Sequence, residues 1–125
     1  MTIIWHVDDD QEMLQAMDLM LKMIGFETRF FLRARPAAEA LLAGGKPDAL
    51  LLDINMPEVS GMDLLEFVRR RAEWNSLPVV MLSTEAADVT VDNAMQLGAD
   101  GYVTKPVTID ELKHEINNAI AKRRS

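Results

Sequence analysis

The sequence contains no cysteine, no long apolar run, and fewer cationic than acidic side chains: 13 Lys and Arg against 20 Asp and Glu. The absence of cysteine excludes disulfides and thiolate metal sites and is compatible with a reducing, cytoplasmic environment. Without a long apolar run or a charged leader, we expect no membrane span and no signal peptide. The formal net charge of -7 also argues against direct nucleic-acid binding by this chain.

The length and composition fit one domain. A chain of 125 residues with 49% hydrophobic side chains can bury its own core without a disulfide or metal staple. We find no internal repeat and no low-complexity segment. Residues 1–125 are therefore expected to form a single unit.

Apolar runs and amphipathic segments alternate along the chain. Strands are expected over residues 3–7, 26–32, 50–53, 78–82 and 101–104, and helices over residues 11–24, 37–43, 62–71, 87–97 and from 109 onward. Such alternation predicts an α/β fold, a doubly wound (βα)5 domain with a parallel sheet and helices on both faces. Glu27 and Arg29 alternate with apolar residues, which places the second strand at an edge of the sheet.

The stretch from Leu50 to Gly61 is the most informative. Three leucines predict a strand buried on both faces, and Asp53 comes where that strand ends. Pro57 is expected to stop the strand, because proline has no amide proton to donate. Ser60 is expected to cap the next helix, with Asp63 in its first turn. Asp53 is thus held between two rigid elements. From this segment alone, a helix-capping or solvated aspartate is as good an interpretation as a functional carboxylate.

Polar residues follow four of the five predicted strands: Asp8 and Asp9, Asp53, Ser83, and Lys105. In a parallel sheet these positions meet at one edge, where ligands commonly bind. Clustered carboxylates repel one another unless a cation lies among them, and oxygen ligands favour Mg²⁺. A positioned carboxylate, a divalent cation and a lysine are the groups that phosphoryl transfer needs.

These residues and their spacing resemble a response-regulator receiver domain of the CheY-like family along essentially the whole chain. The matching segments are Asp8-Asp9, Leu51-Leu52-Asp53-Ile54-Asn55-Met56-Pro57, Ser83 after Val79-Val80-Met81-Leu82, Gly98-Ala99-Asp100-Gly101-Tyr102, and Lys105-Pro106. The resemblance implies a sheet of strand order 2-1-3-4-5. It also implies a signalling switch rather than an enzyme with a separate substrate.

The resemblance assigns Asp53 as the phosphoacceptor and Mg²⁺ as the cofactor. Asp9 and Asp53 would be direct metal ligands, and Asp8 would act mainly through water. The backbone carbonyl of Asn55 would complete the protein ligands. The phosphoryl group would come from a phosphohistidine on a histidine kinase or a histidine phosphotransfer protein.

The resemblance also implies a conformational switch. Ser83 and Lys105 would hold the phosphoryl oxygens, and the Lys105-Pro106 bond would be cis. On phosphorylation Ser83 would move toward the phosphoryl group and Tyr102 would turn inward. This would repack the surface formed by the fourth helix, fifth strand and fifth helix for a downstream protein or for an output domain beyond this sequence.

Two positions depart from the usual receiver pattern. Thr84 stands where alanine or glycine is common, and it could restrict access to Asp53. His6 lies in a strand normally filled by aliphatic residues; we expect a buried, neutral histidine with a hydrogen bond rather than a metal ligand.

Other interpretations remain open. The chain could be a phosphorylation-independent interaction module of the same fold, although such modules usually lack part of the acidic and lysine set. Leu19 and Met23 fall off the buried face of the first helix and are either ordinary exposed residues or a partner patch. The segment Lys122-Arg123-Arg124 is expected to be a solvated helix end, or else the start of a linker.

Overall fold

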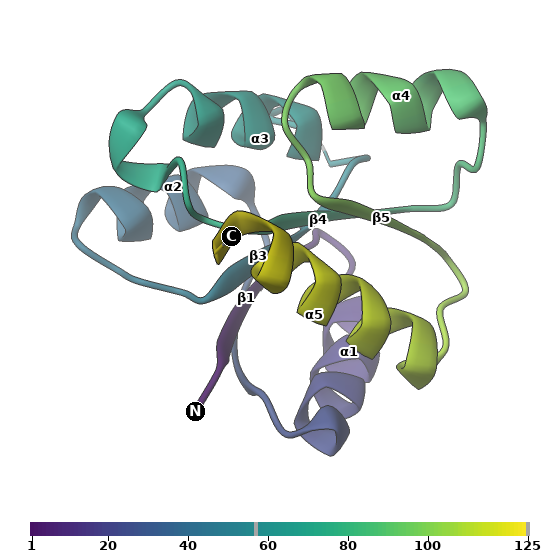
Figure 1. Cartoon of the computed structure of the whole chain (residues 1–125). Helices are drawn as coiled ribbons and strands as arrows, with labels where there is room; N and C mark the ends of the chain where they lie inside the picture. The colour runs from purple at the N-terminus through teal and green to yellow at the C-terminus, as the bar shows by residue number, and fades with distance from the viewer. Residues whose placement is uncertain (57, 125) are drawn as a thin grey trace.

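A computed structural model describes residues 1–56 and 58–124 of the chain (Figure 1). The strands are β1 (Ile3–Val7), β2 (Glu27–Phe31), β3 (Ala49–Asp53), β4 (Val79–Ser83) and β5 (Gly101–Thr104). The helices are α1 (Gln11–Ile24), α2 (Ala34–Leu42), α3 (Gly61–Arg69), α4 (Asp88–Gln96) and α5 (Ile109–Arg124), with a short 3-10 helix η1 (Ala72–Trp74) before β4.

The five strands form one parallel sheet in the order β2-β1-β3-β4-β5, so the predicted fold is confirmed. Helices α1 and α5 cover one face, and α2, α3 and α4 cover the other (Figure 1). Strand β3 lies in the middle: Leu51 packs toward α1 and α5, while Leu50 and Leu52 pack toward α2 and α3. This explains the continuous apolar run before Asp53, because both faces of the strand are covered.

The predicted element boundaries hold to within about two residues except at α2. This helix begins at Ala34 rather than after Pro36, three residues earlier than expected. Proline is tolerated in the first turn because the amides there have no intrahelical acceptor. Pro57, expected to stop β3, lies outside the described residues. Within the described residues, no helix is long and apolar enough to cross a membrane.

Candidate functional site

The predicted site residues do meet at the carboxyl edge of the sheet. Asp8 follows β1, Asp53 ends β3, and Ser83 ends β4. Lys105 follows β5, and its backbone amide donates to the Ser83 carbonyl at 2.8 Å. The parallel topology alone brings these positions together, because every strand ends at the same edge.

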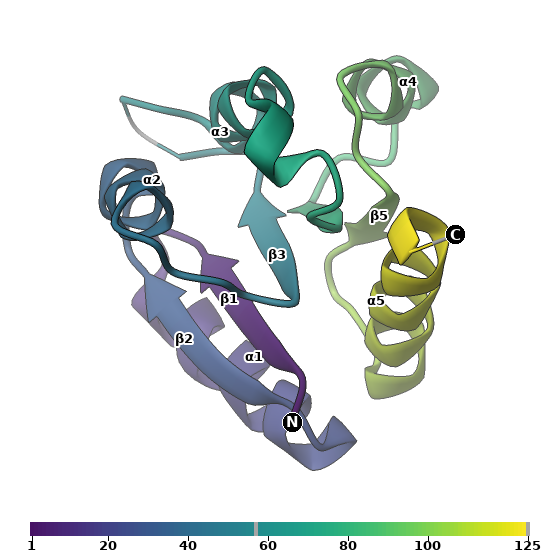
Figure 2. The ribbon, with the colours of Figure 1, turned by 60° about the vertical axis from the view of Figure 1, so that its left-hand side comes forward.

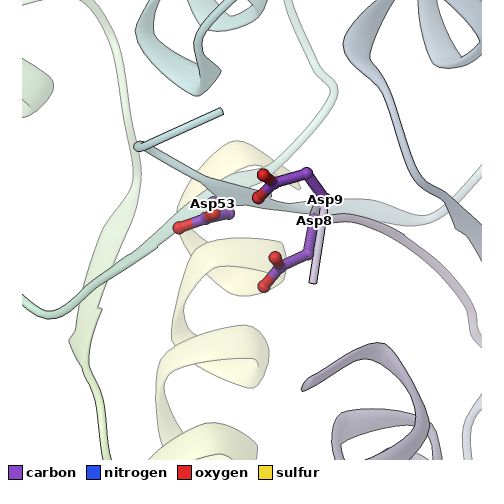
Figure 3. Close-up of side chains that lie close together, drawn as sticks. All are labelled: Asp8, Asp9 and Asp53. Atoms are coloured by element: carbon purple, nitrogen blue, oxygen red, sulfur yellow. The ribbon is translucent and has the colours of Figure 1, made fainter. Parts of the chain in front are cut away.

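Three carboxylates form the centre of this site. One carboxylate oxygen from each of Asp8, Asp9 and Asp53 lies within 4.8 Å of the others. Figure 3 shows the side chains of Asp8 and Asp9, from the end of β1, beside that of Asp53 at the end of β3. Asp8 and Asp53 are buried and Asp9 is partly exposed, so the cluster has one open side. A cavity of about 280 Å³ opens there and is lined by Asp8, Asp9, Asp10, Asp53, Asn55, Thr84 and Lys105.

Lys105 supplies the positive charge of the site. Its Nζ atom lies 3.2 Å from Asp8 Oδ2 and 3.5 Å from Asp53 Oδ1. Burial and the neighbouring Asp8 carboxylate raise the pKa of Asp53 to about 6, and the Lys105 ammonium opposes them. Lys105 therefore does not offset burial and the Asp8 charge together, and three carboxylates around one ammonium favour an additional cation.

The oxygen atoms at this site match the ligands that Mg²⁺ requires. Magnesium takes oxygen ligands, usually one or two carboxylates, and keeps water or phosphate oxygens in its remaining positions. Asp9 is partly exposed and lines the cavity, and the buried Asp53 lines it from the end of β3. Asp8 is already engaged: Oδ1 accepts from the Asp10 amide at 2.9 Å, and Oδ2 faces Lys105. The residues present fit a hard divalent cation such as Mg²⁺. Asp8 is best suited to interact with that cation through water rather than as a direct ligand.

The end of β3 is fixed by the helix that follows. Ser60 Oγ accepts from the Asp63 amide, and Asp63 accepts from the Ser60 amide, so the predicted cap of α3 is a full capping box. Gly61 donates to the Ile54 carbonyl and lies directly against the backbone of Asp53. A β-carbon at position 61 would overlap the Asp53 carbonyl, so only glycine allows this close approach.

Ser83 and Tyr102 are linked through Glu85, which sequence reasoning did not identify. Ser83 Oγ accepts from the Glu85 amide at 3.0 Å, and the Tyr102 hydroxyl donates to the Glu85 carbonyl at 2.7 Å. Ser83 is buried and does not line the cavity, whereas the exposed Thr84 does. The link joins β4 to β5 through a loop, and no local pattern in the sequence could have indicated it.

His6 differs from the expectation in one respect. It is buried, and burial together with the nearby Lys105 charge lowers its pKa to about 3, so the ring is neutral. The expected hydrogen bond is wrong: neither ring nitrogen has a partner within the described residues. Nε2 lies 3.8 Å from Asp8 Oδ2, beyond hydrogen-bond distance.

Two further polar residues have structural roles. Asp10 caps α1, accepting from the Glu12 and Met13 amides at 3.0 and 3.2 Å. Its position directly before an amphipathic segment was a usable sequence signal. Arg123 is not simply a solvated helix end, because its Nε donates to the buried Asp100 at 2.6 Å. Arg69 donates to the other oxygen of Asp100, and this long-range pairing had no sequence signal.

Comparisons with known proteins agree with this geometry. Residues 4–117 match the family model described as response regulator receiver domain. The chain is 36% identical to the chemotaxis protein CheY of Pseudomonas aeruginosa, over 88% of this chain and 89% of that protein. It is 32% identical to the transcriptional regulatory protein KdpE of Mycobacterium tuberculosis, over 98% of this chain. The chain spans 52% of KdpE and 18% of the protein RcaC of Microchaete diplosiphon, which is 34% identical.

Solved structures show the same fold. A response regulator receiver domain protein from Clostridium thermocellum superimposes with a TM-score of 0.89, at 27% identity, over 99% of this chain and 98% of that one. For a putative response regulator from Chloroflexus aurantiacus the TM-score is 0.90 at 28% identity, covering 96% and 98% of the two chains.

Proposed function

Because the chain belongs to the response-regulator receiver domain family, we propose that it is a phosphorylation-activated switch whose phosphoacceptor is Asp53. Receiver domains take phosphoryl groups from histidine kinases in two-component signalling. The observation that carries the proposal is the convergence of Asp53, two further carboxylates and Lys105 on one open cavity. Residues 1–125 are proposed as one receiver unit, whether alone or within a longer regulator.

The chemistry is an in-line transfer from a phosphohistidine. An Asp53 carboxylate oxygen forms a bond to phosphorus while the phosphorus–nitrogen bond breaks and its electron pair returns to the histidine ring. Lys105, 3.5 Å from Asp53, would donate to the phosphoryl oxygens. Asp53 is ionised above its pKa of about 6 and can act as the nucleophile at neutral pH.

Magnesium would be held by Asp9 and Asp53, with the backbone carbonyl of Asn55 as a further ligand and Asp8 acting through water. When bound, the cation would offset much of the negative charge of the carboxylates and of the incoming phosphoryl group. Asp8 would also orient Lys105, since its Oδ2 lies 3.2 Å from the ammonium.

The proposed switch would act through the shared contact of Ser83 and Tyr102 with Glu85. Ser83 does not line the cavity, so its side chain would have to rotate to reach a phosphoryl oxygen, and Oγ would then move away from the Glu85 amide that it accepts from. The loop that carries Glu85 then shifts, and the hydroxyl of Tyr102 loses or follows its acceptor. Helix α4 is suited to move with this loop, because Ala94 is its one buried residue. The α4-β5-α5 surface would thereby change for a downstream protein or an output domain.

The test is phosphorylation by acetyl phosphate with and without Mg²⁺, measured by intact mass. We expect one added phosphate in the presence of Mg²⁺, none in Asp53→Asn, and an unchanged result in Asp92→Asn, which alters an exposed aspartate on α4. Peptide mapping should place the phosphate on Asp53. A phosphate retained by Asp53→Asn would refute the assignment.

A panel of purified histidine kinases and phosphotransfer proteins carrying labelled phosphate would then identify the donor. A phosphorylation-independent interaction module is the alternative function. It predicts no incorporation from any donor, together with partner binding that Asp53→Asn leaves unchanged. The complete acidic and lysine set at one cavity favours the switch.

A further inference from the structure

Away from the acidic site, the outer edge of β2 carries backbone groups that find no strand partner among the described residues. β2 is the outermost strand, and among the described strands it pairs with β1 alone (Figure 2). The Glu27 amide donates to the Thr2 carbonyl at 2.9 Å, and the Phe31 carbonyl accepts from the Asp8 amide at 3.0 Å. Because backbone groups alternate along a strand, those of Thr28 and Phe30 point outward.

The same edge exposes apolar side chains. Phe30 is 47% exposed, and Leu32, just beyond the strand, is 46% exposed. An edge strand with free backbone groups is a template for another strand, and proteins usually protect it with charges or a covering segment. Here the charges are Glu27 and Arg29, two exposed residues of opposite sign that share one face of β2.

We propose that β2 pairs antiparallel with β2 of a second copy of this chain, about a two-fold axis at Thr28. The outward backbone groups of Thr28 in the two copies would then bond to each other. Glu27 would lie opposite Arg29 of the second copy, and this ion pair would occur twice. These two positions form non-hydrogen-bonded pairs, in which opposed Cα atoms are about 4.5 Å apart.

The charges select this register over its neighbours. A two-fold axis at Arg29 would place the two Arg29 side chains against each other, and an in-register parallel pairing would oppose like charges along the strand. With the axis at Thr28, Phe30 would also lie across from the half-buried Phe26 of the second copy. The contact uses the same patch on both copies and therefore closes as a dimer. Exposed ion pairs are weak, so a concentration-dependent dimer is expected rather than a permanent one.

The proposal is tested by charge reversal and sedimentation velocity on the full chain. We expect wild type to dimerise with increasing concentration, and Glu27→Arg and Arg29→Glu each to remain monomeric. Mixing the two single variants restores both opposite-charge pairs, as does the double variant, so association should return in both samples. Glu73→Arg and Arg70→Glu make the same changes in net charge at exposed positions in η1 and directly after α3, away from β2 and from the α4-β5-α5 surface, and should associate like wild type.

Folding of the variants is checked separately, because Arg29 also lies 5.0 Å from the Trp5 ring and 4.7 Å from the Phe31 ring. Thermal melts identify any variant that is unfolded. If Arg29→Glu is unfolded, the register is still tested by Glu27→Arg, which should lose association while its net-charge control Glu73→Arg keeps it. Asp53→Asn should dimerise like wild type, since β1 separates β3 from β2, so this test is independent of the phosphorylation proposal. A chain that stays monomeric at every concentration, or a dimer insensitive to both single reversals, overturns the proposal.

Discussion

Replacing Asp53 by asparagine is expected to stabilise the metal-free protein at neutral pH. The pKa of Asp53 is raised from 3.8 to about 6, first by burial and then by the Asp8 charge. The native state therefore binds a proton more tightly than the unfolded chain between these two pH values. The contribution of Asp53 to the free energy of unfolding of the wild-type protein therefore falls as pH rises from about 4 to 6 and stays lower above that range. Asparagine has nearly the same shape and no charge, so it removes this cost.

The magnitude follows from the size of the pKa shift. About two pKa units correspond to roughly 3 kcal/mol at about 1.4 kcal/mol per unit, which is an upper limit. The cavity beside Asp53 opens to solvent, and screening there reduces the effect to about 1–2 kcal/mol. The difference between variant and wild type should be small near pH 4 and reach this value at pH 7.5.

Urea unfolding without metal, followed by tryptophan fluorescence at several pH values, measures the difference. Titrating groups distant from Asp53 act alike in both proteins and cancel in the difference. Asp92→Asn is the matched control and should show no comparable pH-dependent gain. Added Mg²⁺ should reduce the advantage of Asp53→Asn, because a ligand that binds the native wild type stabilises it. The reasoning is contradicted if Asp53→Asn is no more stable than wild type at pH 7.5. It is also contradicted if the difference in free energy of unfolding between the two proteins is the same at every pH.

Three further predictions concern neighbouring residues. Asp9→Ala should weaken Mg²⁺ binding strongly and Asp8→Ala about tenfold, measured by metal titration of tryptophan fluorescence; equal affinity of Asp9→Ala and wild type would contradict the ligand assignment. Thr84 lines the cavity with a stiff, branched side chain that restricts access to Asp53. Thr84→Ala should therefore speed both phosphorylation by acetyl phosphate and hydrolysis of the phosphoaspartate, with unchanged Mg²⁺ affinity. An unchanged rate of hydrolysis would show that Thr84 does not restrict access. Asp100 accepts hydrogen bonds from Arg69, Arg123 and the Val79 amide. Asp100→Asn should therefore lower the free energy of unfolding, measured by urea denaturation, by about 3 kcal/mol. A loss no larger than that of a surface substitution would show that the ion pairs of Asp100 do not stabilise the fold.

The sequence was sufficient for the fold and for the meeting of the site residues because both depend on regular patterns. Alternating strands and helices determine a parallel sheet, and a parallel sheet brings Asp8, Asp53, Ser83 and Lys105 to one edge without any knowledge of side-chain packing. Capping residues such as Ser60 were equally predictable, since they act on amides three positions away.

Contacts between distant elements were not predictable in the same way. The Arg69–Asp100–Arg123 cluster joins the ends of α3 and α5 to β5, and Glu85 links Ser83 to Tyr102. Such pairings depend on how helices lie against the sheet, which hydrophobic periodicity does not specify. The start of α2 was missed for a local reason, because proline is compatible with several positions in a first turn.

His6 shows why the unusual residue in β1 does not disturb the acidic site. Above the pKa of Asp53, three carboxylates and one lysine ammonium give the site a formal charge of -2, which one Mg²⁺ neutralises. A protonated His6 beside Asp8 would reduce that charge and weaken the attraction for the cation. Burial lowers the pKa of His6 to about 3, so the ring stays neutral over the range in which Asp53 ionises. The burial that leaves both ring nitrogens without partners among the described residues thus also preserves the charge balance of the metal site.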